Sequence, residues 1–455
     1  MTAILSDKFK FILAEKLFDE VTNASDSHEY YIGIGKSDAY GDPDTPVDPL
    51  RTLVEERELR NNLQSVKKVA ATSFVASRYN WTSGSIYNSF NDAQVGVAAQ
   101  PYYVLTDANE VYICLQQGKN AAGTTNTSTV KPNFTTAGVS ETQAFETADG
   151  YRWKLLYSIS ATKATDFLSS SFIPVEKTTI DSASANAFQL QQLNIQNLST
   201  PKQIIGTTLV SGGSGYTSAP TVSINGNGSG AAATATISGG QVVKVEMNNE
   251  SAALGSGYDY ASIAFSGGGG AGADFNPIIT SDIGIGNDPR KDLKSSSIML
   301  NTKPNGTESG TFIVDQDFRQ IGVFRDLEIF DSSGVFSATS GLALRFMKFG
   351  QTVTFAKDDV IRGPAIADGS RPQAHVVDVQ DSIVYYTQND ETGFTAFTDG
   401  TLIDDRDGSE QATVDSANRY SIVDQYSGDV LYIENRNRVV RSTSQTEDIK
   451  VVITV

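Results

Sequence analysis

Residues 209–282 constrain the fold of this chain more than any other segment, because glycines break short alternating runs at close intervals. The tetrapeptide Gly-Ser-Gly-Tyr occurs at 213–216 and again at 255–258, and each copy precedes a short alternating strand and a glycine cluster. Glycine permits the tight turns that such short strands need. Two imperfect copies are too few for a solenoid, so the segment predicts a small β module of hairpins rather than a flexible linker.

The composition changes at both ends of this segment, which indicates an insertion into a larger core. We therefore predict three parts. Residues 1–204 and 283–455 form the N-terminal and C-terminal parts of the core, and 205–282 form the Gly-rich module between them.

Helical patterns are prominent only near the N-terminus. Apolar residues recur at helical spacing in 7–22, where Ser6 can cap the first turn. A second helix is predicted from about Leu50 to Val69, after a proline-containing stretch that keeps the chain extended or turning.

Strand patterns dominate the rest of the sequence. They predict hairpins at 102–115 and 376–387, and a strand at 151–159. Residues 449–455 alternate as a half-buried strand, and an Arg-rich turn connects them to the strand-like run before. The predicted fold class is mainly β: a multi-domain β-sandwich-like architecture with a few helices near the N-terminus and an inserted small Gly-rich β domain.

Charge and cysteine content limit the possible partners. The formal net charge of −18 argues against a nucleic-acid partner, which would require basic patches. No run of the sequence approaches the ~18 apolar residues of a membrane span, so we expect no membrane insertion. A single cysteine, Cys114, excludes an intramolecular disulfide and fits synthesis in a reducing cytoplasm.

Two segments imitate nucleotide-binding motifs. Gly35-Lys36-Ser37 match the end of a P-loop, but the glycine that this motif requires five residues earlier is Tyr30. We interpret the segment as a buried strand that ends in a glycine turn. Residues 228–233 match G-x-G-x-x-A, but an alternating run follows where a dinucleotide site needs a helix.

No catalytic constellation, cofactor site or metal site is predicted. The acidic run at 402–410 lacks EF-hand spacing and is interpreted as a solvated turn. The chain has two histidines, His28 and His375, far apart in sequence, so a metal site built on them has no support from spacing. Catalysis by a pair of carboxylates stays open, because spacing in the sequence does not show which carboxylates face each other in the fold.

Four segments resemble a virion protein family, the baseplate wedge subunit called gene product eight of T-even-type contractile-tailed phages. Residues 427–450, SGDVLYIENRNRVVRSTSQTEDIK, resemble its C-terminal signature, and DFRQIGVFRDLEIF at 317–330 resembles its FRQI segment. DGYRWKLLYSI at 149–159 resembles its central strand motif, and YYIGIGKSDAY at 30–40 its opening strand. The likeness covers roughly 1–180 and 285–455 and omits the Gly-rich module.

This resemblance implies a structural protein without catalysis or cofactor. Members of the family are mainly β, form homodimers and assemble with other wedge subunits at the periphery of the baseplate. They relay host contact to sheath contraction. The implied location is the virion tail baseplate, with synthesis and assembly in the cytoplasm of the bacterial host.

Candidate interface residues follow from the same segments. Arg436, Arg438 and Arg441 beside QTED at 445–448 are expected to form polar pairs with a neighbouring subunit, and a solvated turn with local ion pairs is the alternative. Phe318 and Arg319 of the FRQI segment are further candidates.

Two other functions stay open. The Gly-rich module is the candidate glycan-binding part of a tail adhesin, with Tyr216, Tyr258 and Tyr260 as residues that can stack on sugars. An envelope glycosidase has only the abundance of carboxylates in its favour.

Overall fold

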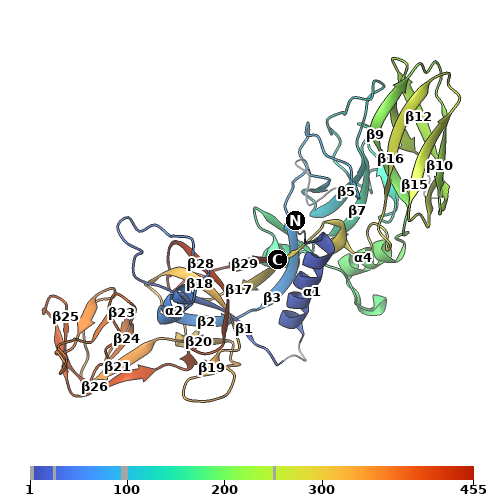
Figure 1. Ribbon diagram of the computed structural model, residues 1–455. Coiled ribbons are helices and arrows are strands. Elements are labelled where there is room, and N and C mark those ends of the chain that lie inside the picture. Colours follow the sequence, from blue (N-terminus) through green and yellow to red (C-terminus); the bar gives the residue numbers. More distant parts are fainter. Residues whose placement is uncertain (1–4, 24–26, 94–100, 249–252) are drawn as a thin grey trace. The chain divides into compact units, whose positions relative to one another are not determined.

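The computed structural model describes residues 5–23, 27–93, 101–248 and 253–455. It is mainly β, with 41% strand and 12% helix, which confirms the predicted fold class. The chain forms two compact units (Figure 1). Unit 1 comprises Met1–Lys16, Ser73–Met299 and Thr454–Val455, and unit 2 comprises Leu17–Thr72 and Leu300–Ile453.

The helices are short except for the first. They are α1 Asp7–Thr22, α2 Leu53–Asn61, α3 Ala161–Phe167, α4 Ala187–Asn197 and α5 Pro289–Asp292, with 3-10 turns at Ser182–Ser184 and Glu308–Gly310. The prediction for 7–22 is confirmed. The helix predicted for 50–69 is wrong beyond Asn61, because the chain from Leu63 pairs with a neighbouring strand instead.

Most strands of unit 1 belong to a four-stranded sheet and to the Gly-rich module. The sheet has the order β4-β5-β7-β6, and helix α4 packs on β7. These strands are β4 Tyr103–Leu105, β5 Glu110–Gln116, β6 Ala144–Glu146 and β7 Arg152–Ser158. The predicted hairpin at 102–115 and the predicted strand at 151–159 are confirmed, and Cys114 lies in the core beside Trp153.

The Gly-rich module consists of two-stranded antiparallel pairs, β9–β16, β10–β15, β11–β14 and β12–β13. Its strands are β9 Ile204–Ser214, β10 Thr221–Gly226, β11 Ser229–Ala231, β12 Ala233–Ser238, β13 Gln241–Met247, β14 Leu254–Ser256, β15 Ala261–Ser266 and β16 Ala271–Ile279. Each Gly-Ser-Gly-Tyr copy puts its tyrosine against a glycine. A Cβ on Gly270 would lie 2.5 Å from Tyr216 Cγ, and one on Gly228 would lie 2.5 Å from Tyr258 Cγ. The repeat thus fixes two equivalent tyrosine–glycine contacts.

Unit 2 contains a five-stranded sheet of order β20-β2-β1-β18-β28 and a closed six-stranded barrel of order β21-β24-β23-β22-β25-β26. The sheet strands are β1 Tyr30–Gly35, β2 Leu63–Lys68, β18 Asp317–Arg325, β20 Ser340–Leu342 and β28 Asp429–Val440. The barrel strands are β21 Arg345–Phe349, β22 Val360–Arg362, β23 Gln373–Gln380, β24 Ile383–Thr387, β25 Leu402–Asp405 and β26 Gln411–Tyr420. The predicted hairpin at 376–387 is β23–β24.

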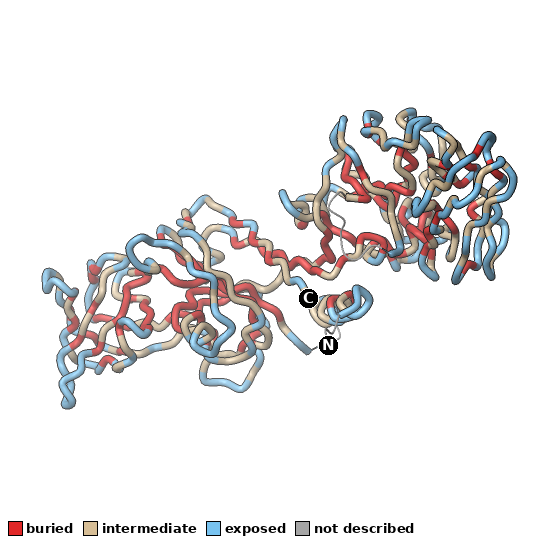
Figure 2. Tube along the Cα trace, turned by 45° about the horizontal axis from the view of Figure 1, so that its top comes forward, coloured by how far each residue is buried: buried red, intermediate tan, exposed pale blue. Residues whose placement is uncertain are grey.

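A further four-stranded sheet has the order β29-β17-β3-β8. These strands are β3 Ala71–Ser77, β8 Phe172–Val175, β17 Ser297–Thr302 and β29 Ile449–Thr454, and β19 Glu328–Ile329 pairs with β27 Val423–Asp424 elsewhere. The predicted C-terminal strand is therefore confirmed, with Ile449 and Val451 buried. Both units contain buried residues along the chain (Figure 2).

Candidate functional site

The most conspicuous polar cluster of unit 2 begins where β1 ends. Gly35 has no side chain, and a Cβ at this position would collide with the carbonyl oxygen of Asn62. Lys36 follows with φ 62°, and its N–H donates a hydrogen bond of 3.1 Å to the same carbonyl. The predicted buried strand that ends in a glycine turn is confirmed.

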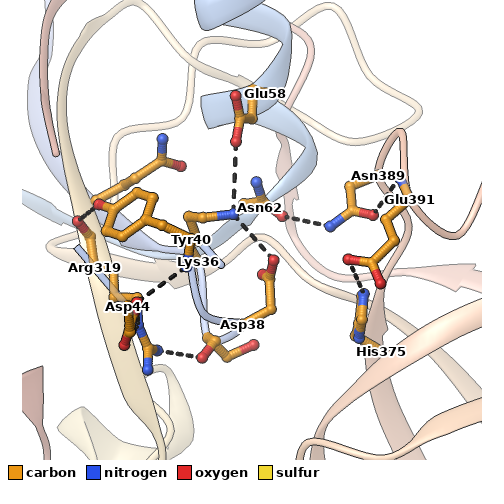
Figure 3. Close-up of polar contacts among 12 residues, drawn as sticks. Lys36, Asp38, Tyr40, Asp44, Glu58, Asn62, Arg319, His375, Asn389 and Glu391 are labelled. Carbon is orange, nitrogen blue, oxygen red and sulfur yellow. Dashed lines mark hydrogen bonds and ion pairs between the residues drawn. The ribbon is translucent and has the colours of Figure 1, made fainter. Parts of the chain in front are cut away.

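Lys36 is the buried cation of this cluster. Its Nζ lies 3.0 Å from Asp38 Oδ2 and 3.5 Å from Glu58 Oε1, and it lies over the ring of Tyr40 (Figure 3). The lysine that imitates a P-loop lysine in the sequence therefore has carboxylate partners within its own unit. Its ammonium pairs with Asp38 Oδ2, whereas Asp38 Oδ1 has no hydrogen-bond partner among the described residues.

Arg319 anchors the loop that carries Asp38. Its guanidinium donates to the carbonyl of Ser37 and, through Nε, to Asp44 Oδ2 at 2.9 Å. The hydroxyl of Tyr40 donates to the Arg319 carbonyl at 2.6 Å. Burial raises the pKa of Tyr40 to about 12, and a hydrogen bond from the Tyr40 N–H, together with Arg319, lowers the pKa of Asp44. These contacts hold the loop in one conformation.

His375 and Glu391 reach the same place from the barrel and its flanking loop. His375 lies on β23 and is 7% exposed, and its Nε2 is 3.8 Å from Glu391 Oε2. The side-chain oxygen of Asn389 accepts hydrogen bonds from the N–H groups of Glu391 and Thr392, at 3.1 and 3.2 Å. The side-chain amide of Asn389 donates to Asn62 Oδ1 at 3.4 Å, so the loop with Glu391 is tied to the residue that follows α2.

Asp38, His375 and Glu391 offer ligand atoms that all lie within 4.8 Å of one another. They are the one group of three His, Cys, Asp or Glu side chains with this spacing within residues 5–23, 27–93, 101–248 and 253–455. Figure 3 shows the three side chains converging from the loop after β1, from the barrel and from the loop at 389–391. The sequence alone does not predict this cluster, because its members lie far apart in the chain and no spacing pattern connects them.

Polar atoms without hydrogen-bond partners gather at this cluster. Among the described residues, Asp38 Oδ1, Asn62 Nδ2, His375 Nε2 and Thr387 Oγ1 are buried and have no such partner. Thr387 is the cross-strand neighbour of His375. Buried polar atoms are almost always hydrogen-bonded, and exceptions point to a missing water, an ion or a functional role.

The predicted interface arginines have different environments. Arg436 and Arg438 lie on β28 and not in a turn, and the side chain of Arg438 is 58% exposed. Arg441 is 1% exposed: it pairs with Glu447 at 2.9 Å and donates to the carbonyls of Ile313 and Gly306. Its contacts lie inside the unit, which corrects the expectation that it faces another subunit.

The expectation that Phe318 and Arg319 face another subunit is also wrong. Both are buried, at 2% and 5% exposure. Arg319 anchors the loop after β1, and Phe318 belongs to the interior of the five-stranded sheet. Of the five candidate interface residues, Arg436 and Arg438 thus have accessible side chains, and for them the interface stays a prediction.

The three candidate glycan-binding tyrosines also differ. Tyr216 and Tyr258 are 5% and 2% exposed and pack against glycines of the module, so neither presents a face to a sugar. Tyr260 is 67% exposed. The tyrosines next to the repeated glycines are core residues because each glycine opposite allows the ring to approach the backbone.

No family model and no curated protein matches this sequence. Among the described residues, none of the helices has the length and apolar character required to cross a membrane.

Proposed function

We propose that this chain is a structural subunit of the baseplate wedge of a contractile phage tail and acts through protein–protein interfaces. The observation that carries the proposal is the spatial arrangement of the segments that resemble the wedge family. The segments at 30–40, 317–330 and 427–450 contain β1, β18 and β28, which are consecutive neighbours in one sheet. Three likenesses that are distant in sequence therefore belong to one structural element.

The strand β28 supports an interface at the edge of this sheet. It pairs with β18 on one side and ends the sheet in the described part of the chain. The loop after β1 covers its middle, where the Arg436 N–H donates to Tyr40 Oη at 3.2 Å. Leu431 and Val440, towards its two ends, are 41% and 50% exposed. An exposed edge with apolar side chains is a typical place for pairing with another chain.

The proposal includes homodimerisation and contacts with other wedge subunits, at an edge that the fold leaves accessible. The alternative function is a glycan-binding tail adhesin. Of its three candidate tyrosines, Tyr260 is accessible, whereas Tyr216 and Tyr258 are buried, so this function has less support than the wedge subunit.

Immunogold electron microscopy of intact virions, with antibody against the purified chain, tests the proposal. Label at the rim of the baseplate supports a wedge subunit. Label along fibres or at their tips favours the adhesin instead, and particles without label contradict both.

A further inference from the structure

We infer that Asp38, His375 and Glu391 bind a divalent transition-metal ion, with Zn²⁺ as the best match. The inference is independent of the proposed function. It assigns a structural ion that connects the loop after β1 to strand β23 and to the loop at 389–391, all within unit 2.

The donor atoms favour a metal of this class. An imidazole nitrogen with two carboxylate oxygens suits Zn²⁺ and its first-row neighbours, whereas Ca²⁺ and Mg²⁺ prefer oxygen alone. Three protein ligands leave one position of a tetrahedral ion for water. The exposed side of the cluster, where the Glu391 side chain is 72% exposed, provides the access for the ion and the water.

The distances allow an ion with small side-chain movements. An ion central to three atoms at most 4.8 Å apart lies within about 2.8 Å of each, and Zn–N and Zn–O bonds are about 2.0–2.2 Å long. Each side chain then needs to move by less than about 1 Å. Glu391 is exposed and can adjust, whereas His375 and the loop of Asp38 are held by the packing and hydrogen bonds described above.

Two further observations point to a cation. Two of the three side chains each have a buried atom without a hydrogen-bond partner among the described residues, Asp38 Oδ1 and His375 Nε2. Asp38, Glu58 and Glu391 also carry three negative charges against the single positive charge of Lys36, so the cluster has a net charge of −2 with a neutral imidazole. A divalent cation would satisfy the free atoms and balance this charge.

Titration calorimetry with Zn²⁺ on the tag-free, chelator-treated full chain tests the inference. We expect one high-affinity site in the parent chain, with little competition from Ca²⁺ or Mg²⁺. His375→Gln should weaken binding more than about a hundredfold, beyond the 10–100-fold typical of losing a supporting residue. Substitution by Co²⁺ should give visible absorption bands in the parent chain and none in His375→Gln.

His28→Gln is the matched control, because His28 is the other histidine of the chain and lies beside Asp326 at 2.5 Å instead of in the cluster. It should bind Zn²⁺ like the parent chain. If His375→Gln loses its native circular dichroism, Glu391→Gln replaces it, since that exposed side chain is not part of the core. Absence of Zn²⁺ binding in the parent chain, or equal binding in all variants, overturns the inference.

Discussion

The two units differ in how they accommodate buried charge. In unit 2, buried Arg441 pairs with buried Glu447 and donates to two backbone carbonyls, and its guanidinium lies over Phe312. Arg441 Nε and Glu447 Oε1 nevertheless have no hydrogen-bond partner among the described residues, and the same holds for Nη1 of buried Arg152 in unit 1. The difference is that Arg441 has an ion-pair partner, whereas Arg152 has none closer than 4.0 Å among the described residues.

Unit 1 also contains buried Asp292 and half-buried Lys154 without a close ion pair between described residues. Burial lowers the pKa of Lys154 and raises that of Asp292 to about 7, despite a hydrogen bond of 2.7 Å from the Gly286 N–H to Asp292 Oδ2. A buried ion with a good partner keeps its charge, whereas a buried ion without one changes its protonation equilibrium. The stability of unit 1 should therefore depend on pH more than that of unit 2.

The two tryptophans offer a way to test this difference. Trp81 and Trp153 both lie in unit 1, so tryptophan fluorescence reports on that unit, while far-UV circular dichroism reports on both.

The largest effect is expected for Arg441→Met. The substitution leaves the carboxylate of Glu447 buried without its partner, which should reduce the free energy of unfolding of unit 2 by about 3–5 kcal/mol. Urea unfolding followed by circular dichroism measures the change. The double variant Arg441→Met/Glu447→Leu should regain most of the loss, and a double variant as unstable as the single one would contradict the ion-pair explanation.

The second-largest effect is the change in stability with pH that comes from the titration of Asp292. Its pKa is raised from 3.8 to about 7, so the folded state holds a proton that the unfolded state releases. The contribution of this group to stability is complete below about pH 4, falls as pH rises, and is lost above about pH 7. Asp292→Asn mimics the protonated form, so its stability relative to the parent chain should increase between pH 4 and 7. Fluorescence-detected unfolding at several pH values measures this difference, and a constant difference would show that Asp292 is ionised throughout.

Arg152→Met, unlike Arg441→Met, should not destabilise its unit. The substitution removes a desolvated charge from unit 1 and replaces it with an apolar side chain of similar length, so the free energy of unfolding should stay the same or rise. The same urea experiment, read by fluorescence, gives the comparison. A loss as large as that of Arg441→Met would mean that Arg152 has a partner as effective as Glu447.

The smallest effect on folding is expected for half-buried Arg436 and exposed Arg438. Arg438 pairs with buried Asp317, but Arg319 remains as a second partner of that carboxylate. Arg436→Ala/Arg438→Ala should therefore lower the free energy of unfolding by only about 1 kcal/mol but impair assembly with other wedge subunits. Arg371→Ala/Arg406→Ala is the matched control, because both arginines are exposed and lie outside β28. Co-expression and pull-down of wedge complexes measure the result, and normal assembly of the Arg436/Arg438 variant would reject this edge as the interface.

Local sequence patterns determined much of the secondary structure. The apolar spacing of 7–22, the hairpin turns at 106–109 and 381–382, and the glycines of the module all act between residues close in the chain. Helix α4 also has a local signal in the sequence, a capping box between Asn186 and Gln189. Such signals are readable because their energies depend on neighbours within a few residues.

Tertiary structure decided the rest. Helix α2 ends at Asn61 because the residues after it pair with β1, and Tyr216 and Tyr258 are buried because glycines from other strands allow them to pack. The cluster of Asp38, His375 and Glu391 exists because a loop, a barrel strand and a second loop meet in space. The sequence by itself determined a mainly β chain with a glycine-rich module, but burial, ion pairing and the meeting of distant ligands depend on contacts that only the folded chain makes.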